Sequence, residues 1–512
     1  MLFNSYAFIF IFLPITLWGF VVLGKYSSRR VALVWLIAAS LFYYGWWNPA
    51  YLGLILGSMF FNYAMGAVLL GNAGSPNRKL LLIVGITANL SLLAYYKYAN
   101  FFIETINVVL STDWNIQHVI LPLAISFFTF QQITYLVDTY RGETREYNFL
   151  QYALFVSFFP QLIAGPIVHH REMMPQFARL DTKRFNHEYF AIGLTIFFMG
   201  LFKKVVLADS LSPYAIETFS AVSGGNLLSL LEAWKGVFAY TFQLYFDFSG
   251  YSDMAVGSAY MFGIRLPLNF NSPYKSLNII EFWQRWHITL SRFLRDYLYI
   301  PLGGNRKGAM RRYVNLMITM LLGGLWHGAG WTYIAWGGIH GMYLVINHAW
   351  RYIKAAAGIS SKQSAPVLFL SRCLTFTAVA VAWVYFRADT IEAANAMIKS
   401  MAGFGGVAWP EEARGQLGVF ANIFSSWGLR YQPLEYFNGG ANVLMIVSLL
   451  AFVWLAPNLQ QLFYRSPAVL EPLERSYISW HAEKKWLVFV MIISVVSILK
   501  LGQVSEFLYF QF

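Results

Sequence analysis

Long apolar runs separated by short polar links make up most of this chain. A helix that crosses the roughly 30 Å hydrocarbon core of a bilayer needs about 20 apolar residues. The runs that approach this length are Ala7–Leu23, Val31–Trp47, Leu52–Leu70, Leu80–Tyr96, Ile120–Val137, Phe190–Phe202, Leu227–Tyr245, Tyr313–Leu325, Trp331–Asn347, Val367–Phe386, Val443–Leu455 and Trp486–Leu499. They predict an all-α polytopic membrane protein with about eleven transmembrane helices. The first run lacks the charge pattern of a cleavable signal.

The segment Phe149–Ile167 is apolar but broken by Pro160, Gly165 and Pro166. Basic residues flank it on both sides, so both flanks are expected in the cytoplasm. Two interpretations stay open at this point, a re-entrant loop sheltered by protein and an ordinary spanning helix with a kink.

The basic tracts between the apolar runs set the expected orientation. Lys and Arg accumulate in cytoplasmic loops, which places Lys25–Arg30, Arg78–Lys79 and Arg141–Arg145 inside. The links Asn48–Tyr51 and Asp113–Asn115 then lie outside. Successive loops agree with each other.

The composition supports the membrane assignment. Hydrophobic residues make up 58% of the chain and charged residues 12%, against about 45–50% and about 25% in soluble proteins. The net charge of +13 is spread over short tracts such as Lys203–Lys204 and Arg306–Arg312, so it indicates cytoplasmic loops and not nucleic-acid binding. The single cysteine, Cys373, excludes an intramolecular disulfide and multi-cysteine metal sites.

Metal and nucleotide motifs are missing from the sequence. It contains no P-loop, dinucleotide-binding, zincin or nucleophile-elbow motif. His169 and His170 are adjacent in a basic tract without clustered Cys or carboxylates, and we expect a solvated loop pair there and no metal site. The interval Gly403–Ala441, rich in Gly with several Pro and Glu residues, is expected to form an exposed loop or small cap.

Two carboxylates lie among aromatic residues at the end of an apolar run. Asp247 and Asp253 belong to the segment Tyr245–Ala255, and ionisable groups at membrane depth mark functional sites. A structural ion pair with Arg285 as the candidate partner is the favoured interpretation, because a buried carboxylate must be paired in either case.

The stretch Glu281–Ile300 has the periodicity of an amphipathic helix at a membrane surface. At 100° per residue His287 falls on the apolar face, whereas Arg292 and Arg295 fall on the opposite one. The two arginines could contact the phosphates of a donor substrate or simply anchor the helix to anionic lipid.

A glycine-rich segment carries the strongest candidate for catalysis. His327 follows Trp326 among four nearby glycines, which let a substrate or another backbone approach closely. A buried neutral histidine can act as a general base toward a hydroxyl that attacks a thioester; the alternative is a histidine that only packs. His340 lies about 20 Å further along a straight helix, so it is considered separately.

Several motifs together resemble one family. They are Lys97–Phe101, Leu121–Phe127, Phe159–Pro166, Tyr245–Ala255, Phe282–Ile288, Leu294–Tyr299, Gly303–Arg306, Gly323–Gly328 and Phe386–Ala388. In this order they resemble the membrane-bound O-acyltransferases, and among them the bacterial branch that acetylates exopolysaccharides such as alginate. The resemblance covers residues 1–389 and implies a membrane-embedded core there, followed by C-terminal helices over 390–512.

The resemblance implies how the protein works. His327 matches the essential histidine of the family, inside a central tunnel, and His287 matches its second polar position. The implied donor is acetyl-CoA or an acyl-loaded carrier, with no bound cofactor. The acetyl group would pass outward through the bacterial inner membrane to a hydrolase-like extracytoplasmic partner, which acetylates the polysaccharide. Supporting polar or tunnel positions are then Asp247, Asp253, Arg285, Trp326 and His340.

Two other functions were weighed. A lipid or protein O-acyltransferase of the same superfamily fits the motifs less closely, because they match the polysaccharide branch. A transporter or export channel would use Asp247, Asp253 and Arg285 to line a pathway, but it has no need for two histidines among aromatic residues.

Overall fold

The computed structural model confirms an almost entirely helical protein. It describes residues 1–72, 74–115, 119–144, 148–182, 184–358, 364–426, 429–436, 440–502 and 508. Arg145, which belongs to one predicted cytoplasmic tract, lies outside these residues. Five helical segments in the described part are long and apolar enough to cross a membrane: Phe8–Tyr26, Tyr51–Gly71, Arg78–Leu110, His187–Ser223 and Ala365–Arg387.

The chain divides into two compact units. The first comprises Met1–Phe202, Ser249–Asn269 and Leu459–Val504, and the second comprises Lys203–Phe248, Phe270–Asn458 and Ser505–Phe512. Helix α12 (Leu230–Met261) contributes to both. It runs unbroken through Gly250, so this glycine does not end the helix. The sequence-based division at residue 389 stays a prediction.

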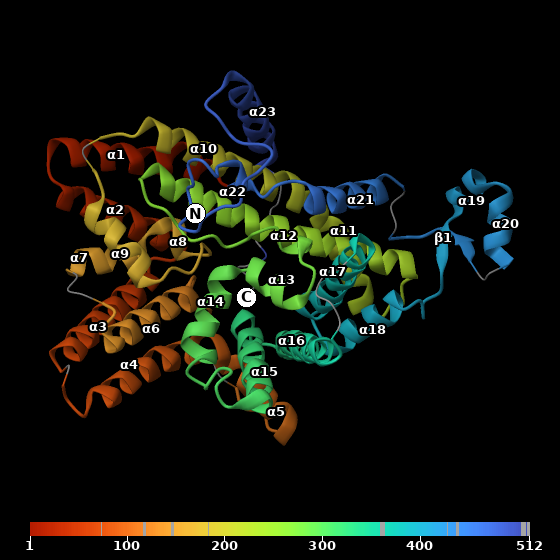
Figure 1. The fold of residues 1–512 in the computed structure, drawn as a ribbon, viewed down its shortest axis with the longest axis horizontal. Helices are drawn as coiled ribbons and strands as arrows, with labels where there is room; N and C mark the ends of the chain where they lie inside the picture. Colours follow the sequence, from red (N-terminus) through yellow and green to blue (C-terminus); the bar gives the residue numbers. More distant parts are fainter. Residues whose placement is uncertain are drawn as a thin grey trace. The chain divides into compact units, whose positions relative to one another are not determined.

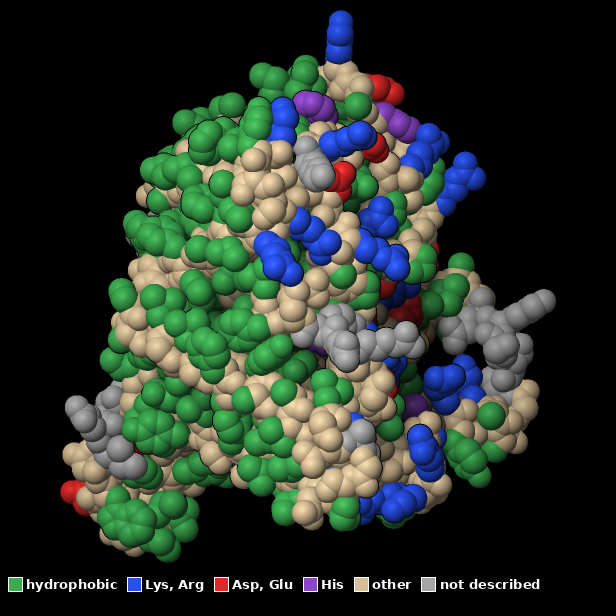
Figure 2. Space-filling view, turned by 90° about the vertical axis from the view of Figure 1, so that its left-hand side faces the viewer, with side chains coloured by type: hydrophobic (Ala, Val, Ile, Leu, Met, Phe, Trp, Pro, Cys, Tyr) green, Lys and Arg blue, Asp and Glu red, His purple; other side chains and the backbone are tan. Residues whose placement is uncertain are grey.

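The first unit contains the N-terminal helices, which Figure 1 shows in red to yellow. Its helices are α1 (Leu13–Tyr26), α2 (Arg29–Gly45), α3 (Tyr51–Gly71), α4 (Arg78–Leu93), α5 (Ala99–Leu110), α6 (Ile125–Arg141), α7 (Phe149–Ser157), α8 (Phe159–Leu162), α9 (His170–Arg179), α10 (His187–Phe202), α22 (Leu459–Leu462) and α23 (Lys484–Lys500). Helix α1 packs on α2, and α6 packs on α3 and α4. In Figure 2, Lys and Arg side chains gather beside a broad hydrophobic surface, as expected where a membrane protein leaves the bilayer.

The segment Phe149–Ile167 is not a spanning helix. Helix α7 and the short α8 are separated at Phe158, and the residues from Tyr152 to Ile167 are buried. A helix of nine residues extends only about 14 Å, less than half of the hydrocarbon core. The structure therefore agrees with the re-entrant interpretation.

The second unit contains the elements that carry the candidate site. They are α11 (Asp209–Ser223), α13 (Ile279–Arg285), α14 (Ile288–Leu294), α15 (Gly308–His327), α16 (Trp331–Ala356), α17 (Ala365–Arg387), α18 (Ile391–Met401) and α21 (Gly440–Leu455). A π-helical stretch, Lys203–Ala208, precedes α11, and another, Arg295–Tyr299, follows α14. Helix α16 packs on α15, α17 and α13.

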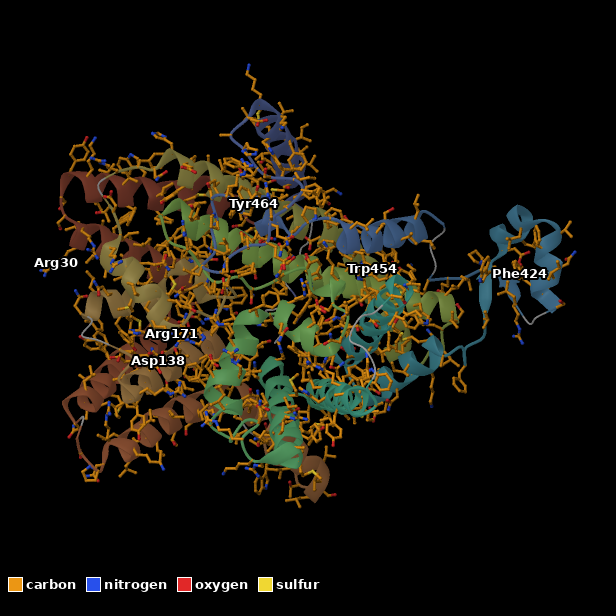
Figure 3. The ribbon with its side chains drawn as sticks, in the orientation of Figure 1. Arg30, Asp138, Arg171, Phe424, Trp454 and Tyr464 are labelled. Atoms are coloured by element: carbon orange, nitrogen blue, oxygen red, sulfur yellow. The ribbon has the colours of Figure 1, made fainter. Side chains whose placement is uncertain are left out.

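The described residues of the polar interval 403–441 form a small cap. Strands β1 (Ala408–Pro410) and β2 (Arg430–Gln432) pair in parallel, and α19 (Glu411–Leu417) and α20 (Val419–Ser426) lie between them in sequence. Figure 3 labels Phe424 in this cap. The cap agrees with the predicted exposed structure.

Candidate active site

The site is built on a tight pair of antiparallel helices, α15 and α16. A methyl group on Gly324 would overlap the carbonyl oxygen of Tyr333, and one on Gly337 would overlap that of Met320. The two glycines therefore allow the backbones to approach more closely than any side chain permits. The helices are joined by a reversal at Gly328–Gly330, so the glycine-rich segment bends as the sequence allowed.

His327 is the last residue of α15 and is enclosed by aromatic rings. Its side chain is buried. The ring centroid lies 5.0 Å from that of Trp326, 5.1 Å from Trp336 and 5.3 Å from Phe386. Trp336 comes from α16 and Phe386 from α17, so three helices fix the position of the imidazole. This setting excludes bulk water from most of the ring.

His287 lies at a break in the predicted amphipathic helix. The stretch Glu281–Ile300 was expected to be one helix, but α13 ends at Arg285 and α14 begins at Ile288. His287 itself has a left-handed backbone, with φ 41°, which a continuous right-handed helix does not accommodate. The helical-face prediction for His287 is therefore wrong in its geometry, although the side chain is indeed buried.

The break brings His287 to His327. Their ring centroids are 6.3 Å apart. Phe248 of α12 packs edge-on against His287 at 4.7 Å, and Phe270 is stacked with it at 6.4 Å. The two histidines that the sequence singled out, forty residues apart in the chain, thus share one aromatic chamber in the second unit.

Burial determines the protonation state of His287, which lies outside the spanning segments. It lowers the pKa of the imidazole from 6.5 to about 3, because the charged form loses its hydration. His287 is therefore neutral at physiological pH. A neutral imidazole has one nitrogen that donates a hydrogen bond and one that accepts.

His340 occupies the same aromatic cluster one turn further along α16. Its ring lies 4.9 Å from that of Trp336, which also contacts His327. Phe282 and Trp283 of α13 also contact it, at 6.0 and 5.1 Å. The reversal between α15 and α16 thus places His340 near the other histidines, which the straight-helix distance had argued against.

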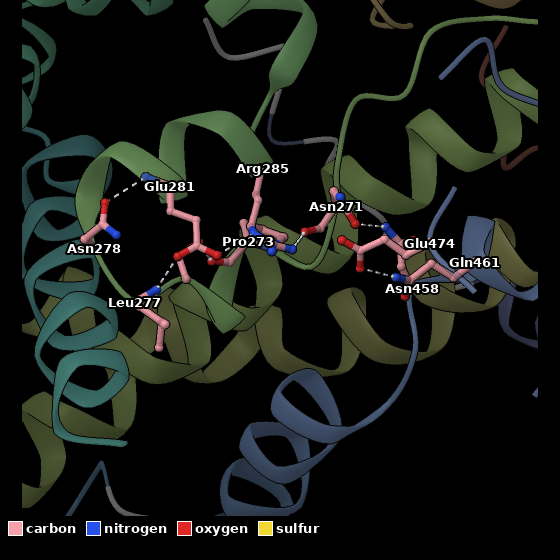
Figure 4. A network of polar contacts seen from close by, with 10 residues as sticks. Asn271, Pro273, Leu277, Asn278, Glu281, Arg285, Asn458, Gln461 and Glu474 are labelled. Carbon is pink, nitrogen blue, oxygen red and sulfur yellow. Dashed lines mark hydrogen bonds and ion pairs between the residues drawn. The ribbon is translucent and has the colours of Figure 1, made fainter. Parts of the chain in front are cut away.

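Arg285 does not pair with Asp247, contrary to the candidate ion pair. Its Nε donates to Glu281 at 2.9 Å, and its Nη1 donates to the carbonyl of Asn271 at 3.1 Å. Figure 4 shows this network, in which Asn278 accepts a hydrogen bond from the backbone N–H of Glu281. Arg285 forms an ion pair with Glu281, four residues earlier on the same helix. This local pair, and not a longer-range pair with Asp247, satisfies the charge of the guanidinium.

Asp247 pairs with a lysine that the sequence analysis had assigned to a cytoplasmic tract. Lys204 Nζ lies 2.6 Å from Asp247 and 2.7 Å from Asp209, and the Lys204 side chain is 2% exposed. Lys204 belongs to the π-helical stretch between α10 and α11, inside the helical segment His187–Ser223. Its assignment to a cytoplasmic loop is therefore wrong. The signal that could have found it is a lysine inside an apolar run with acidic residues nearby.

The remaining sequence candidates have separate surroundings. Asp253 lies in the first unit and accepts a hydrogen bond from Gln460 at 2.8 Å. Arg295 is exposed and pairs with Asp296 through two nitrogens, at 2.7 and 3.2 Å. Arg292, on α14, is half-buried.

His169 and His170 are buried, not solvated. Their exposed fractions are 1% and 0%, and the ring of His170 packs between Tyr135 and Phe155. Burial lowers the pKa of His170 to about 3. Helix α9, which begins at His170, packs on α6 and α7, and these contacts bury the pair. The described residues contain no group of three His, Cys, Asp or Glu side chains arranged to hold a metal ion.

Two buried histidines in one aromatic chamber, of which His287 is neutral, suit proton transfer at a hydroxyl group and acyl transfer to it. The comparison with known sequences agrees with this chemistry. The profile of the membrane-bound O-acyltransferase family matches residues 84–385. The chain belongs to this family and is a membrane acyltransferase.

Its relatives include proteins named as O-acetyltransferases of peptidoglycan and of alginate. A peptidoglycan O-acetyltransferase of Helicobacter pylori is 46% identical over 80% of this chain and 81% of its own length. A probable alginate O-acetylase of Pseudomonas aeruginosa is 43% identical over 79% of this chain and 75% of its own. A teichoic acid D-alanyltransferase of Streptococcus thermophilus is 32% identical over 44% of this chain and 57% of its own.

Proposed function

We propose that this acyltransferase moves acetyl groups from a cytoplasmic thioester donor through the bacterial inner membrane for O-acetylation of a surface polysaccharide. The observation that carries the proposal is the pairing of His327 and His287 in one buried aromatic chamber, with their rings 6.3 Å apart. The activities for which the relatives are named, peptidoglycan O-acetyltransferase and alginate O-acetylase, support acetyl as the transferred group and a polysaccharide as the final acceptor.

In the proposed reaction His327 is the general base. It takes the proton of an acceptor hydroxyl while the hydroxyl oxygen attacks the carbonyl carbon of the acetyl thioester. A tetrahedral intermediate forms, and the carbon–sulfur bond then breaks. The proton passes from His327 to the departing sulfur, so that a new ester and a free thiol are the products.

His287 has a positioning and electrostatic role in this scheme. As a neutral imidazole it donates a hydrogen bond to the carbonyl oxygen, which gains negative charge during the attack. Phe248 and Phe270 already hold the His287 ring in place. This hydrogen-bond donor therefore needs little reorganisation when negative charge develops on the carbonyl oxygen. The chamber excludes competing water, which would hydrolyse the thioester.

The donor and the partners complete the proposal. Acetyl-CoA is the proposed donor, with an acyl-loaded carrier as the variant that the D-alanyltransferase relative suggests. A hydrolase-like extracytoplasmic partner accepts the acetyl group and transfers it to the polymer. The cap formed by β1, α19, α20 and β2 follows α18 in the chain.

The test is acetyl transfer from labelled acetyl-CoA by the purified protein in proteoliposomes, together with its partner. Alginate, peptidoglycan and a neutral glucan are supplied in separate reactions. Label in one of the polymers supports the proposal. Label that appears only in lipid, or in a protein other than the partner, would contradict the proposed acceptor. Transfer that requires a labelled acyl carrier in place of acetyl-CoA would contradict the proposed donor.

A further inference from the structure

A cavity in the first unit has an apolar interior and a charged rim. Its volume is about 850 Å³. It lies among the end of α1, the end of α9, the beginning of α10 and the end of α12, and Figure 1 shows the chain leaving α9 and passing α1 to reach α10. The apolar part is formed by Phe20, Val21, Leu180, Phe185, Met261 and Phe262. The rings of Phe20 and Phe262 meet edge to face at 5.3 Å.

Among the described residues that line the cavity, two basic and two acidic side chains lie at the rim. Arg179 and Arg184 are basic, whereas Asp181 and Glu188 are acidic, and all four are exposed. Glu188 accepts a hydrogen bond from Ser466 at 3.1 Å, which holds its carboxylate at the rim. Such a rim complements a ligand that bears both charges, because a purely anionic ligand would face two carboxylates.

The position of the cavity along α1 gives its depth in the membrane. Phe20 precedes Lys25 by five residues, or about 7.5 Å along the helix. Lys25 belongs to the tract expected at the cytoplasmic surface. With that predicted orientation, the interior of the cavity is placed at the cytoplasmic end of the hydrocarbon layer and its rim at the level of the lipid headgroups.

We propose that this cavity is a binding site for a zwitterionic phospholipid of the cytoplasmic leaflet, one that carries a phosphate and a primary ammonium group. Arg179 and Arg184 bind the phosphate, and Asp181 and Glu188 bind the ammonium. An acyl chain lies along Phe20 and Phe262. Basic pockets between helices on the cytoplasmic side bind lipid headgroups in other membrane proteins, and the two carboxylates give this pocket its preference for a zwitterion.

The experiment measures lipid retained by the full chain. The protein is delipidated in detergent, titrated with phosphatidylethanolamine or phosphatidylglycerol, and analysed by native mass spectrometry. We expect phosphatidylethanolamine to bind at least five-fold more tightly than phosphatidylglycerol. Equal affinity, or tighter binding of phosphatidylglycerol, would overturn the proposal.

Two double variants separate the roles of the rim charges. The double variant Arg179→Gln with Arg184→Gln should bind both lipids at least five-fold more weakly. The double variant Asp181→Asn with Glu188→Gln should reduce the affinity for phosphatidylethanolamine. Its affinity for phosphatidylglycerol should be unchanged or higher. The matched control is Arg171→Gln, an exposed arginine on the same helix α9 that pairs with Glu143 at 3.7 Å, and it should change neither affinity. An equal effect of this control would overturn the assignment.

CoA is the second phosphate compound to be tested. If free CoA displaces phosphatidylethanolamine from the wild type, and the arginine pair is required for that displacement, the cavity binds a soluble phosphate ester and the lipid assignment is wrong. Where a double variant fails to fold, as judged by its thermal unfolding in detergent, the single variants Arg184→Gln and Glu188→Gln give the same two comparisons.

Discussion

His327 and His287 are held by different means, although their rings face the same chamber. His327 ends a regular helix and is fixed by rings from three helices. His287 occupies a left-handed backbone position between two short helices. A non-glycine residue with positive φ is uncommon and costs conformational energy, which surrounding contacts must offset. Such strain is concentrated at functional sites, and it agrees with a role for His287 beside His327.

The first prediction concerns His327. His327→Gln keeps the bulk of the side chain but cannot accept a proton, so acetyl transfer should fall by about 10²–10⁴-fold. Membrane insertion and the unfolding temperature should stay near the wild type. The measurement is the transfer rate from labelled acetyl-CoA beside thermal unfolding in detergent. Near-normal acetylation by this variant would mean that His287, and not His327, is the general base. Loss of activity in proportion to loss of stability would indicate that His327 has a packing role only.

The second prediction follows from the low pKa of His287. The unfolded chain protonates this histidine near pH 6.5, but the folded chain keeps it neutral down to about 3. Between these values the unfolded state binds more protons, so stability falls as pH decreases, by up to about 1.4 kcal/mol per pH unit for the group. His287→Asn should make the unfolding temperature less dependent on pH between 6.5 and 5. An unchanged pH slope in the variant would show that His287 is protonated in the fold.

At the scale of elements, the hairpin of α15 and α16 determines where the catalytic groups lie. The glycines at its interface bring Trp336 and His340 of α16 against His327 and α13. Any separation of the two helices would displace Trp336 and open the chamber. The same scale includes the buried contacts of Lys204, which join the π-helical stretch to α11 and α12.

The third prediction tests the close approach of these helices. Gly324→Ala should lower stability by about 1–3 kcal/mol through overpacking, because its methyl group overlaps the carbonyl of Tyr333. Acetyl transfer should fall as well, since Trp336 moves with α16. Gly338→Ala is the matched control on α16, because its added carbon would lie an ordinary 3.5 Å from Leu321. Equal stability of the two variants would contradict the packing argument.

The fourth prediction concerns the ion pair of Lys204 and Asp247. Lys204→Met removes one partner and leaves buried carboxylates, which should destabilise the fold by about 3–5 kcal/mol. Adding Asp247→Asn should restore part of that loss, because the remaining carboxylate is then single. The measurement is a double-mutant cycle from unfolding in detergent. Simple additivity of the two substitutions would show that the pair does not interact.

At the scale of the whole molecule, the chain is a membrane acyltransferase whose polar residues are concentrated in a few places. The described part of the chain contains five helical segments long and apolar enough to cross a membrane, and basic residues lie in links that the sequence assigns to the cytoplasm. The donor enters from that side in the proposed function. Arg292 and Arg295 follow His287 on α14 and the next turn, so they are the proposed contacts of the donor phosphates.

The fifth prediction tests that entry site. Arg292→Glu with Arg295→Glu should weaken donor binding about ten-fold or more, because repulsion replaces attraction at the phosphates. Binding of acetyl-CoA is measured in detergent after anionic lipid has been removed. Arg30→Glu, an exposed arginine in another basic tract, serves as the control and should have little effect. Unchanged affinity in the paired variant would leave these arginines as a membrane anchor.

The hydrophobic pattern alone determined the class of this protein and the position of most of its helices. The local composition singled out the glycine-rich segment with His327. Those properties depend on local composition and on residues adjacent in sequence, which the chain displays directly. The family motifs added His287 as a second candidate, because these motifs also consist of residues adjacent in sequence.

The tertiary structure alone decided which polar groups meet. Lys204 and not Arg285 pairs with Asp247. His287 leaves the helical face through a left-handed backbone, and His340 and His327 both contact Trp336. Each outcome depends on contacts between distant segments or on a single backbone dihedral, and helical periodicity contains neither. The sequence therefore indicated which residues could carry the chemistry, and tertiary packing determined how these residues are arranged.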